Sequence, residues 1–343
     1  MPANISQTLF NSIRNAQDPT YQARVPEATR NNIAEYGQSL SKFPEIYNQF
    51  AAALIQRIGY TIIRATDYVN HLASHKRGYK EMGQITQEIH IDPIQAEGAY
   101  NPAGPNPLGR RPLPNIKAAY HVLDRQDTYC VSIDRSMFMQ NFTSWDRVDE
   151  FIGKLMNSMY VGAAWDEYLC MRQLITNAIS ATEEGKVLAK AYMGEFKAKD
   201  QAAGQALISA LKYLLGDMKF LTNTFNQGGV YAYNRPEDME LFINKDVEPN
   251  VDIYTLTGLF HIEPVMYPTK VFPIDTFQVE NVMGVLADKE WLQCYDVLVS
   301  TEPQRNAQGL FTNFFFHIWQ TLSLSPFVNA VVIYGTDQPT EGT

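Results

Sequence analysis

The stretch SWDRVDEFIGKLMNSMYVGAAWDEYLCMRQLITNAISA, residues 144–181, carries the strongest structural signal in the sequence. Its apolar residues recur every three or four positions over most of the run, which is the period of one helix face. Thr143 or Ser144 can cap the N-terminus, and the acidic residues that follow suit the positive end of the helix dipole. At about 1.5 Å per residue the segment would span roughly 57 Å. The pattern therefore predicts one helix that is long for a globular domain of this size.

The residues before this helix begin with a polar segment. Residues 1–43 are mixed in character, and Pro19 and Pro26 interrupt any long helix, so they are interpreted as an arm rather than part of a core. Residues 44–73 are predicted to be helical, because apolar residues recur every fourth position. These apolar residues are Ile46, Phe50, Leu54, Ile58 and Ile62.

An extended loop is predicted next. Residues 85–92 alternate apolar and polar side chains, residues 117–123 could form a returning strand, and residues 98–114 between them are rich in Gly and Pro. The pattern predicts a two-stranded arm over 85–124, and so long a loop is expected to reach another molecule. The tip residues expected to contact another subunit are Tyr100, Asn101, Pro102, Pro105, Leu108, Arg110 and Arg111. The two arginines could instead bind phosphate, but no helix N-terminus or glycine nest accompanies them.

The sequence after residue 181 predicts a mixed α/β region. A second helix is expected over 201–219, and the later elements are strands at 239–246, 265–275 and 281–288 with a short helix at 251–260. The segment from Leu310 to Tyr334 is the most apolar. Ser325-Pro326 divides it into two strands, of which residues 328–334 are expected to be fully buried. The amide of Asn329 must then find hydrogen-bond partners, which we expect to be the backbone of a neighbouring loop.

The composition excludes several classes of protein. Apolar residues make up 45% of the 343 residues and charged residues only 19%, so the chain has material for a large core and for interfaces. The net charge of −9 argues against a dedicated nucleic-acid binder. Three cysteines without a paired motif indicate reduced thiols, and neither a signal peptide nor an apolar run long enough for a membrane helix is found.

Motifs of catalysis and metal binding are missing from the sequence. It lacks GxGxxG, GxxxxGK[ST], HExxH, GxSxG and an EF-hand loop. His71 and His75 are four residues apart and could share a metal, but no third ligand lies nearby, so they are interpreted as one polar helix face. We therefore expect no enzymatic activity, no cofactor and no metal.

The remaining polar candidates are interpreted structurally. His90 and Asp92 alternate on a predicted strand and are expected on an exposed face. His317 is expected to be a hydrogen-bonded histidine of a core or an interface. Asp166 and Glu167 interrupt the apolar stripe of the long helix; they could form an acid pair, although a polar contact to a neighbour is favoured.

The order of these parts, and three stretches of sequence, resemble one family. AYHVLDRQDTYCVSIDRSMFMQNFTS (119–144), NRPEDMELFINKDV (234–247) and TNFFFHIWQTLSLSPFVNAVVIY (312–334) look like that family's passage into a long helix, one of its strands and its closing segment. The family is the major capsid protein of tailed double-stranded DNA bacteriophages, with the Hong Kong type shell fold. The resemblance covers most of residues 45–335 and is greatest to the small short-tailed phages.

The resemblance implies an α+β capsid fold with five parts. These are an N-terminal arm and helix (1–62), an extended loop region (63–124, hairpin 85–124, tip 98–114), a peripheral domain with the spine helix 144–181 (125–185), an axial domain (186–300), and closing strands of the peripheral domain with a tail (301–343). The arm would reach a neighbouring subunit.

The resemblance also implies partners. Copies of the chain would form the pentamers and hexamers of an icosahedral shell in the virion, with a portal at one vertex and double-stranded DNA bound without sequence specificity; no membrane is involved. Because no charged helical extension precedes the arm, a separate scaffolding protein is expected, and assembly would take place in the host bacterial cytoplasm. Covalent crosslinking is not expected, because the tip contains no lysine and the nearest is Lys117. Two alternatives are another phage assembly component, such as a portal or sheath-like subunit, and a soluble mixed α/β enzyme.

Overall fold

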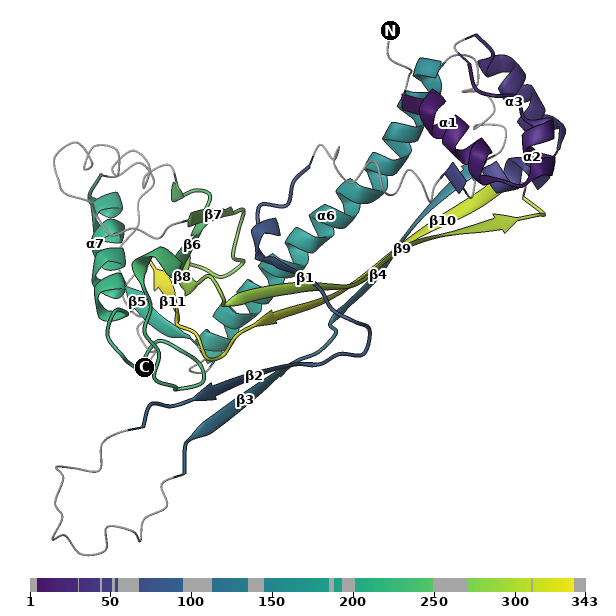
Figure 1. Ribbon diagram of the computed structural model, residues 1–343. Helices are drawn as coiled ribbons and strands as arrows, with labels where there is room; N and C mark the ends of the chain where they lie inside the picture. Colours follow the sequence, from purple (N-terminus) through teal and green to yellow (C-terminus); the bar gives the residue numbers. More distant parts are fainter. Residues whose placement is uncertain are drawn as a thin grey trace, which may run out of the picture. The chain divides into compact units, whose positions relative to one another are not determined.

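The structure is a computed structural model of the chain, and it mixes helices and sheets (Figure 1). It describes residues 5–29, 31–43, 45–50, 53–54, 68–94, 113–134, 145–184, 188–192, 201–248, 270–309 and 311–335. The chain divides into two compact units. Unit 1 consists of Met1–Asn70, Asp124–Tyr168 and Asp296–Gln320. Unit 2 consists of His71–Leu123, Leu169–Tyr295 and Thr321–Thr343.

The long helix predicted over 144–181 is confirmed. Helix α6 runs from Trp145 to Glu184, a length of 40 residues (Figure 1). Its buried apolar residues do not share a single stripe: at about 100° per residue the first two lie on one side of the helix and the last four on nearly the opposite side. These residues are Met159, Ala163, Tyr168, Met171, Ile175 and Ile179.

A four-stranded sheet has the order β1-β9-β10-β4. Its strands are β1 (Lys76–Tyr79), β4 (Arg125–Asp134), β9 (Leu292–Asn306) and β10 (Phe311–Leu324). In unit 1, β10 pairs antiparallel with β4 from Phe311 opposite Asp134 to Gln320 opposite Arg125. Alternate residues of β10, including Phe314 and Phe316, are buried, as the period of a strand requires. The strand predicted after Leu310 is confirmed, whereas β1, β4 and β9 are additional to the prediction.

The N-terminal residues are helical, and the interpretation of residues 1–43 as an arm outside any core is wrong. Helices α1 (Ile5–Ala16), α2 (Pro19–Arg24) and α3 (Ile33–Lys42) form in this segment. Pro19 starts α2 instead of only breaking a helix, because proline suits the first turn and the Asp18 side chain accepts a hydrogen bond from Tyr21 N at 2.8 Å. The three helices contribute to one buried cluster of unit 1, with members Phe10, Ile13, Tyr21, Tyr36, Leu40, Phe50, Met159, Phe314 and Phe316.

The predicted helix over 44–73 is described only in part. Residues 45–50 and 53–54 are helical, but residues 68–72 are not, so the predicted end of this helix is wrong. Residues 55–67 lie outside the described residues, as does the short helix predicted at 251–260.

A five-stranded sheet with one helix forms the centre of unit 2. The strand order is β5-β11-β8-β6-β7; β8 is antiparallel to both of its neighbours, while β5 and β7 pair in parallel with β11 and β6. The elements are β5 (Ala189–Tyr192), α7 (Gln201–Asp217), β6 (Met239–Asn244) after the 3-10 turn η2 (Pro236–Asp238), β7 (Lys270–Ile274), β8 (Val282–Asp288) and β11 (Ala330–Tyr334). Leucines of α7 share a buried cluster with β6, β8 and β11.

The closing segment divides as predicted at Ser325-Pro326. Of the predicted buried residues 328–334, Val328 is half-buried and the rest are buried. The last strand of this segment lies elsewhere than expected. The closing strands were assigned together to the peripheral domain, but β11 lies between β5 and β8 in the sheet of unit 2. The reason is its composition. Successive apolar residues, Val331, Val332 and Ile333, make both faces of β11 apolar, which suits a central strand of a covered sheet.

The amide of Asn329 has its hydrogen bonds satisfied, but by side chains rather than by the backbone expected. Asn329 Nδ2 donates to Asn234 Oδ1 at 2.6 Å, and Asn329 Oδ1 accepts from Asn226 Nδ2 at 3.1 Å. All three amides are buried.

We predict that Asn329→Leu lowers the free energy of unfolding by about 2–4 kcal/mol, because it leaves two buried amide groups short of a partner. Urea unfolding of the purified subunit measures this change. The control Asn223→Leu, at an exposed position, should change the free energy by less than about 0.5 kcal/mol. Equal effects of the two variants would contradict the role given to the buried amides.

Asp288 ends β8 inside the same group of buried polar side chains. It accepts hydrogen bonds from Asn234 Nδ2 and, at 2.7 Å, from Glu290 N. Burial, together with the nearby charges of Glu290 and Asp238, raises the pKa of Asp288 to about 6. The folded state therefore holds this proton more tightly than the unfolded chain does.

The stability that Asp288 contributes is consequently present at low pH and is lost as the pH rises through about 6. We predict that the free energy of unfolding of wild type, relative to Asp288→Asn, falls by about 1 kcal/mol between about pH 5 and pH 7.5. Comparing the two proteins cancels the contribution of the other carboxylates. A difference that stays constant over this range would contradict the prediction.

Candidate functional site

The predicted two-stranded arm is confirmed at its base. Strands β2 (Thr86–Ile91) and β3 (Ile116–His121) pair antiparallel, with Thr86 opposite His121 and Ile91 opposite Ile116 (Figure 1). Both strands alternate between more and less exposed residues. This β2–β3 hairpin belongs to unit 2, and its two faces differ in chemistry.

One face of the hairpin is apolar and exposed. In an antiparallel pair, residues opposite each other share a face, so Ile91 and Ile116 lie together with Ile89, Ala118 and Tyr120. The exposed large apolar residues of the hairpin and its ends are Ile85, Ile89, Ile91, Ile94, Leu113, Ile116, Tyr120 and Val122, with Ile94 81% and Leu113 76% exposed. We call the four large apolar residues that share this face within the strands, Ile89, Ile91, Ile116 and Tyr120, the apolar hairpin face. A contiguous exposed patch of this kind marks an interaction surface.

The opposite face is polar and contacts the rest of unit 2. Glu88 accepts a hydrogen bond from Ser325 Oγ at 2.6 Å, and its second carboxylate oxygen lies 3.0 Å from His121 Nε2. The ring of His90 lies 5.9 Å from that of Phe327, centroid to centroid. The turn at Ser325-Pro326 is therefore one support of the hairpin.

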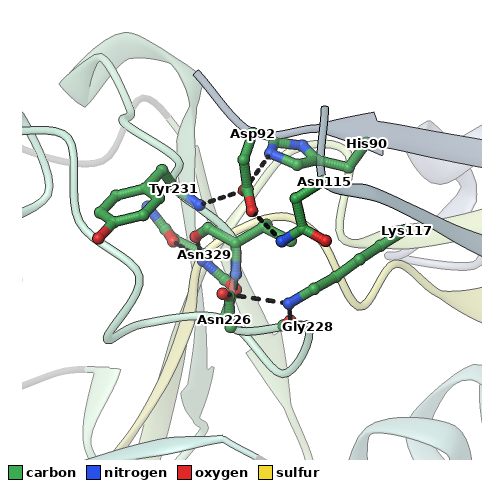
Figure 2. A network of polar contacts seen from close by, with 10 residues as sticks. His90, Asp92, Asn115, Lys117, Asn226, Gly228, Tyr231 and Asn329 are labelled. Atoms are coloured by element: carbon green, nitrogen blue, oxygen red, sulfur yellow. Dashed lines mark hydrogen bonds and ion pairs between the residues drawn. The ribbon is translucent and has the colours of Figure 1, made fainter. Parts of the chain in front are cut away.

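Lys117, also on this face, binds a distant loop of unit 2. Its ammonium group donates to Gly228 O at 2.5 Å and to Gly229 O at 3.3 Å (Figure 2). These carbonyls belong to a loop 111 residues further along the chain. The lysine nearest to the predicted tip is thus bound within its own subunit.

Asp92 follows β2, and its carboxylate binds the backbone of the same loop (Figure 2). It accepts hydrogen bonds from Tyr231 N at 3.3 Å and Asn115 Nδ2 at 2.6 Å, and His90 Nε2 lies 3.5 Å from Oδ1. Partial desolvation acts to raise the pKa of Asp92, but these hydrogen bonds, with His90 and Lys117, outweigh it and hold the pKa below its usual value. Asp92 is therefore a charged acceptor, where the sequence predicted only an exposed strand position.

The tip residues predicted to contact another subunit are not among the described residues. Tyr100, Asn101, Pro102, Pro105, Leu108, Arg110 and Arg111 fall within 95–112. Residues of the apolar hairpin face precede and follow this range in the sequence, and they were not among the predicted contact residues. The alternation of β2 could have revealed this face, because Ile89 and Ile91 share the face that the pleat turns away from Glu88 and His90.

His71 and His75 do not form one polar helix face. Residues 71–72 are a turn, and the 3-10 helix η1 (Ala73–His75) follows. His75 is buried; its Nε2 lies 2.8 Å from Glu240 Oε2 and its Nδ1 lies 3.2 Å from Leu72 O. In the described part of the chain, no group of three His, Cys, Asp or Glu side chains is placed to hold a metal ion.

Asp166 and Glu167 make polar contacts within unit 1, as favoured. Tyr129 Oη donates to Asp166 at 2.8 Å. Glu167 is buried and accepts from Asn70 Nδ2 at 2.8 Å and from Gln320 Nε2 at 2.6 Å. The two carboxylates thus have separate partners.

The two other predicted polar positions are also located. His317 is half-buried and its Nδ1 lies 2.9 Å from Thr128 Oγ1, so its predicted hydrogen bond is present. His90 is half-buried against Phe327 and is not on the exposed face of β2. Among the described helices, none has the length and hydropathy needed to cross a membrane.

A spine-like helix, a long antiparallel sheet, a helix-covered second sheet and a hairpin with an exposed apolar face together define a phage capsid fold. The solved capsid structure of Staphylococcus phage Andhra shares this fold, with a TM-score of 0.63 over 79% of this chain and 85% of that chain, at 10% sequence identity.

The chain belongs to the Phi29-like phage major capsid protein family, whose sequence model matches residues 10–334. It is 31% identical to the major capsid protein of Bacillus phage B103, over 97% of this chain and 74% of that protein. It is 30% identical to the major capsid protein of Bacillus phage PZA, with the same two coverages. The resemblance drawn from the sequence is confirmed: this is a structural capsid protein of a phage virion.

Proposed function

We propose that copies of this chain form the pentamers and hexamers of an icosahedral shell, and that the β2–β3 hairpin is a contact between neighbouring copies. The apolar hairpin face carries this proposal, because it leaves several isoleucines and Tyr120 in water in the single chain. Burying apolar surface stabilises association by about 25 cal/mol per Å² before the costs of ordering. Symmetry repeats each such contact many times.

The tip over 98–114 would extend the same contact. Its seven predicted contact residues include two arginines, which suit an acidic neighbouring subunit. The proposed domains follow the sequence assignment except at β11, which would join the helix-covered sheet of unit 2 in the axial domain. The spine helix would belong to the peripheral domain. The N-terminal helices would contact a neighbour through their outer side.

The further partners are those that the family resemblance implies. They are a separate scaffolding protein during assembly in the host cytoplasm, a portal at one vertex, and packaged double-stranded DNA. The net charge of −9 supports loose contact with DNA, because a wall that binds phosphate weakly lets the packaged DNA slide. No cofactor or metal takes part in this function, and no membrane is proposed as a partner. The engagement of Lys117 within its own subunit supports a shell held without covalent crosslinks.

Electron microscopy of the full-length chain, and of a variant without residues 100–112, tests this proposal. We expect closed shells from the full-length chain under assembly conditions, and folded, soluble subunits that form no closed shells from the variant. Rings or tubes from the full-length chain would indicate a portal or sheath-like component. Shells of normal size from the variant would show that the tip is not an assembly element.

A further inference from the structure

The polar side of the hairpin is held to the rest of unit 2 at a small number of points. Lys117 donates to two backbone carbonyls and Asp92 accepts from the backbone N–H of Tyr231 (Figure 2). Glu88 accepts from Ser325. Bonds between a charged group and a backbone group are stronger than neutral ones and depend on direction. A few contacts of this kind fix an orientation more than they add stability.

The loop that receives Lys117 is itself firmly built. Gly228 N donates to Pro326 O at 2.7 Å. The side chain of Asn226 closes the loop, donating to Val230 O and accepting from Val230 N, both at 2.8 Å. A Cβ atom at Gly228 would lie 2.7 Å from the ring of Phe327, so only glycine fits there. The carbonyl groups that bind Lys117 are therefore presented in fixed positions.

The support formed by Lys117 and Asp92 lies at the far end of the hairpin strands, next to the pair Ile91–Ile116, whereas the base of the hairpin is the pair Thr86–His121. It therefore restrains rotation of the hairpin about that base. A six-residue strand such as β2 spans about 20 Å, at roughly 3.3 Å per residue. A rotation of about 5° at its base would therefore move its far end by about 2 Å. Such a shift is enough to change how an apolar face meets a neighbouring copy.

We propose that Lys117 and Asp92 form a clasp that sets the direction in which the hairpin leaves unit 2, and that this direction selects the curvature of the shell. The inference rests on the proposed role of the hairpin as a contact between copies. It goes further by assigning to two polar residues, which contact no neighbour themselves in this scheme, control over the size of the particle. Both are positioning residues.

The test compares particle diameters, measured by cryo-electron microscopy, for wild type, Lys117→Met, Lys117→Arg and Asp92→Ala under identical assembly conditions. Methionine keeps the apolar stem of lysine but loses its donors, whereas arginine keeps a cation and donors. We expect the fraction of particles with the wild-type diameter to fall at least threefold for Lys117→Met and for Asp92→Ala, and to be largely restored for Lys117→Arg. The melting temperature of the isolated subunits should stay within a few degrees of wild type.

The control is Lys245→Met, at an exposed lysine outside the network, which should leave the diameters unchanged. Wild-type diameters for both Lys117→Met and Asp92→Ala would overturn the clasp, as would a failure of Lys117→Arg to restore the diameter. Neither outcome bears on the proposed contact between the hairpin and a neighbouring copy. That contact is tested separately by placing charges on the apolar hairpin face. Normal shells from that charged variant would overturn the contact, whatever the Lys117 variants do.

Discussion

Replacing Ile91 with Asp and Ile116 with Lys in one chain is expected to abolish shell formation and to leave the subunit folded and soluble. The two residues are opposite each other in the hairpin, and each is 56% exposed. Opposite charges at a cross-strand pair stabilise the hairpin by a few tenths of a kcal/mol, so the hairpin itself should persist. In a packed contact between copies, the same charges would lose water, which costs several kcal/mol for each contact.

Sedimentation velocity and electron microscopy measure the outcome, and thermal unfolding of the isolated subunit reports the fold. The matched control replaces both isoleucines with leucine, which keeps the face apolar, and it should assemble as wild type does. If the charged variant forms shells with wild-type yield, the apolar hairpin face does not lie in an interface.

The second large effect is expected in the core of unit 1. Met159 is 3% exposed on α6 and belongs to the buried cluster that contains Phe314 and Phe316. Met159→Asp places a carboxylate there without a partner, and we expect the free energy of unfolding to fall by about 3–5 kcal/mol. A loss of this size is a large share of the stability of a domain.

The measurements are the soluble yield of the expressed protein and, where protein is recovered, its unfolding by urea. Ser158→Asp is the matched control: it introduces the same charge at the preceding, exposed position of the same helix. The control should express and unfold as wild type does. Wild-type stability for Met159→Asp would mean that Met159 has been assigned to the wrong face of α6.

Some of the fold is predictable because local periodicity and burial agree. The apolar residues of α6 keep a three-to-four spacing through Met159 and Ala163, and the division at Ser325-Pro326 follows from the chemistry of proline. The N-terminal helices could not be predicted from periodicity in the same way, because they are short. Pro19 was interpreted as a break, whereas with Asp18 as its cap it begins α2.

The candidate site was predictable only in outline. Alternation in residues 85–92 identifies the hairpin, and this needs only neighbours in sequence. The clasp depends on residues far apart, because Lys117 binds a backbone carbonyl at Gly228. The buried amide contact of Asn329 with Asn234, 95 residues away, is equally distant in sequence. Backbone acceptors carry no sequence signature, so no motif could have revealed the clasp. The place of β11 in the second sheet likewise depends on pairing between distant strands.

The measurement that tests the central claim most directly is a cryo-electron microscopy map of the assembled shell at a resolution that shows side chains. The account predicts that Ile89, Ile91, Ile116 and Tyr120 of each copy are buried against a neighbouring copy. It also predicts that Lys117 keeps its contact with Gly228 in the same copy. A map in which these four side chains face solvent on both surfaces of the shell would contradict the account.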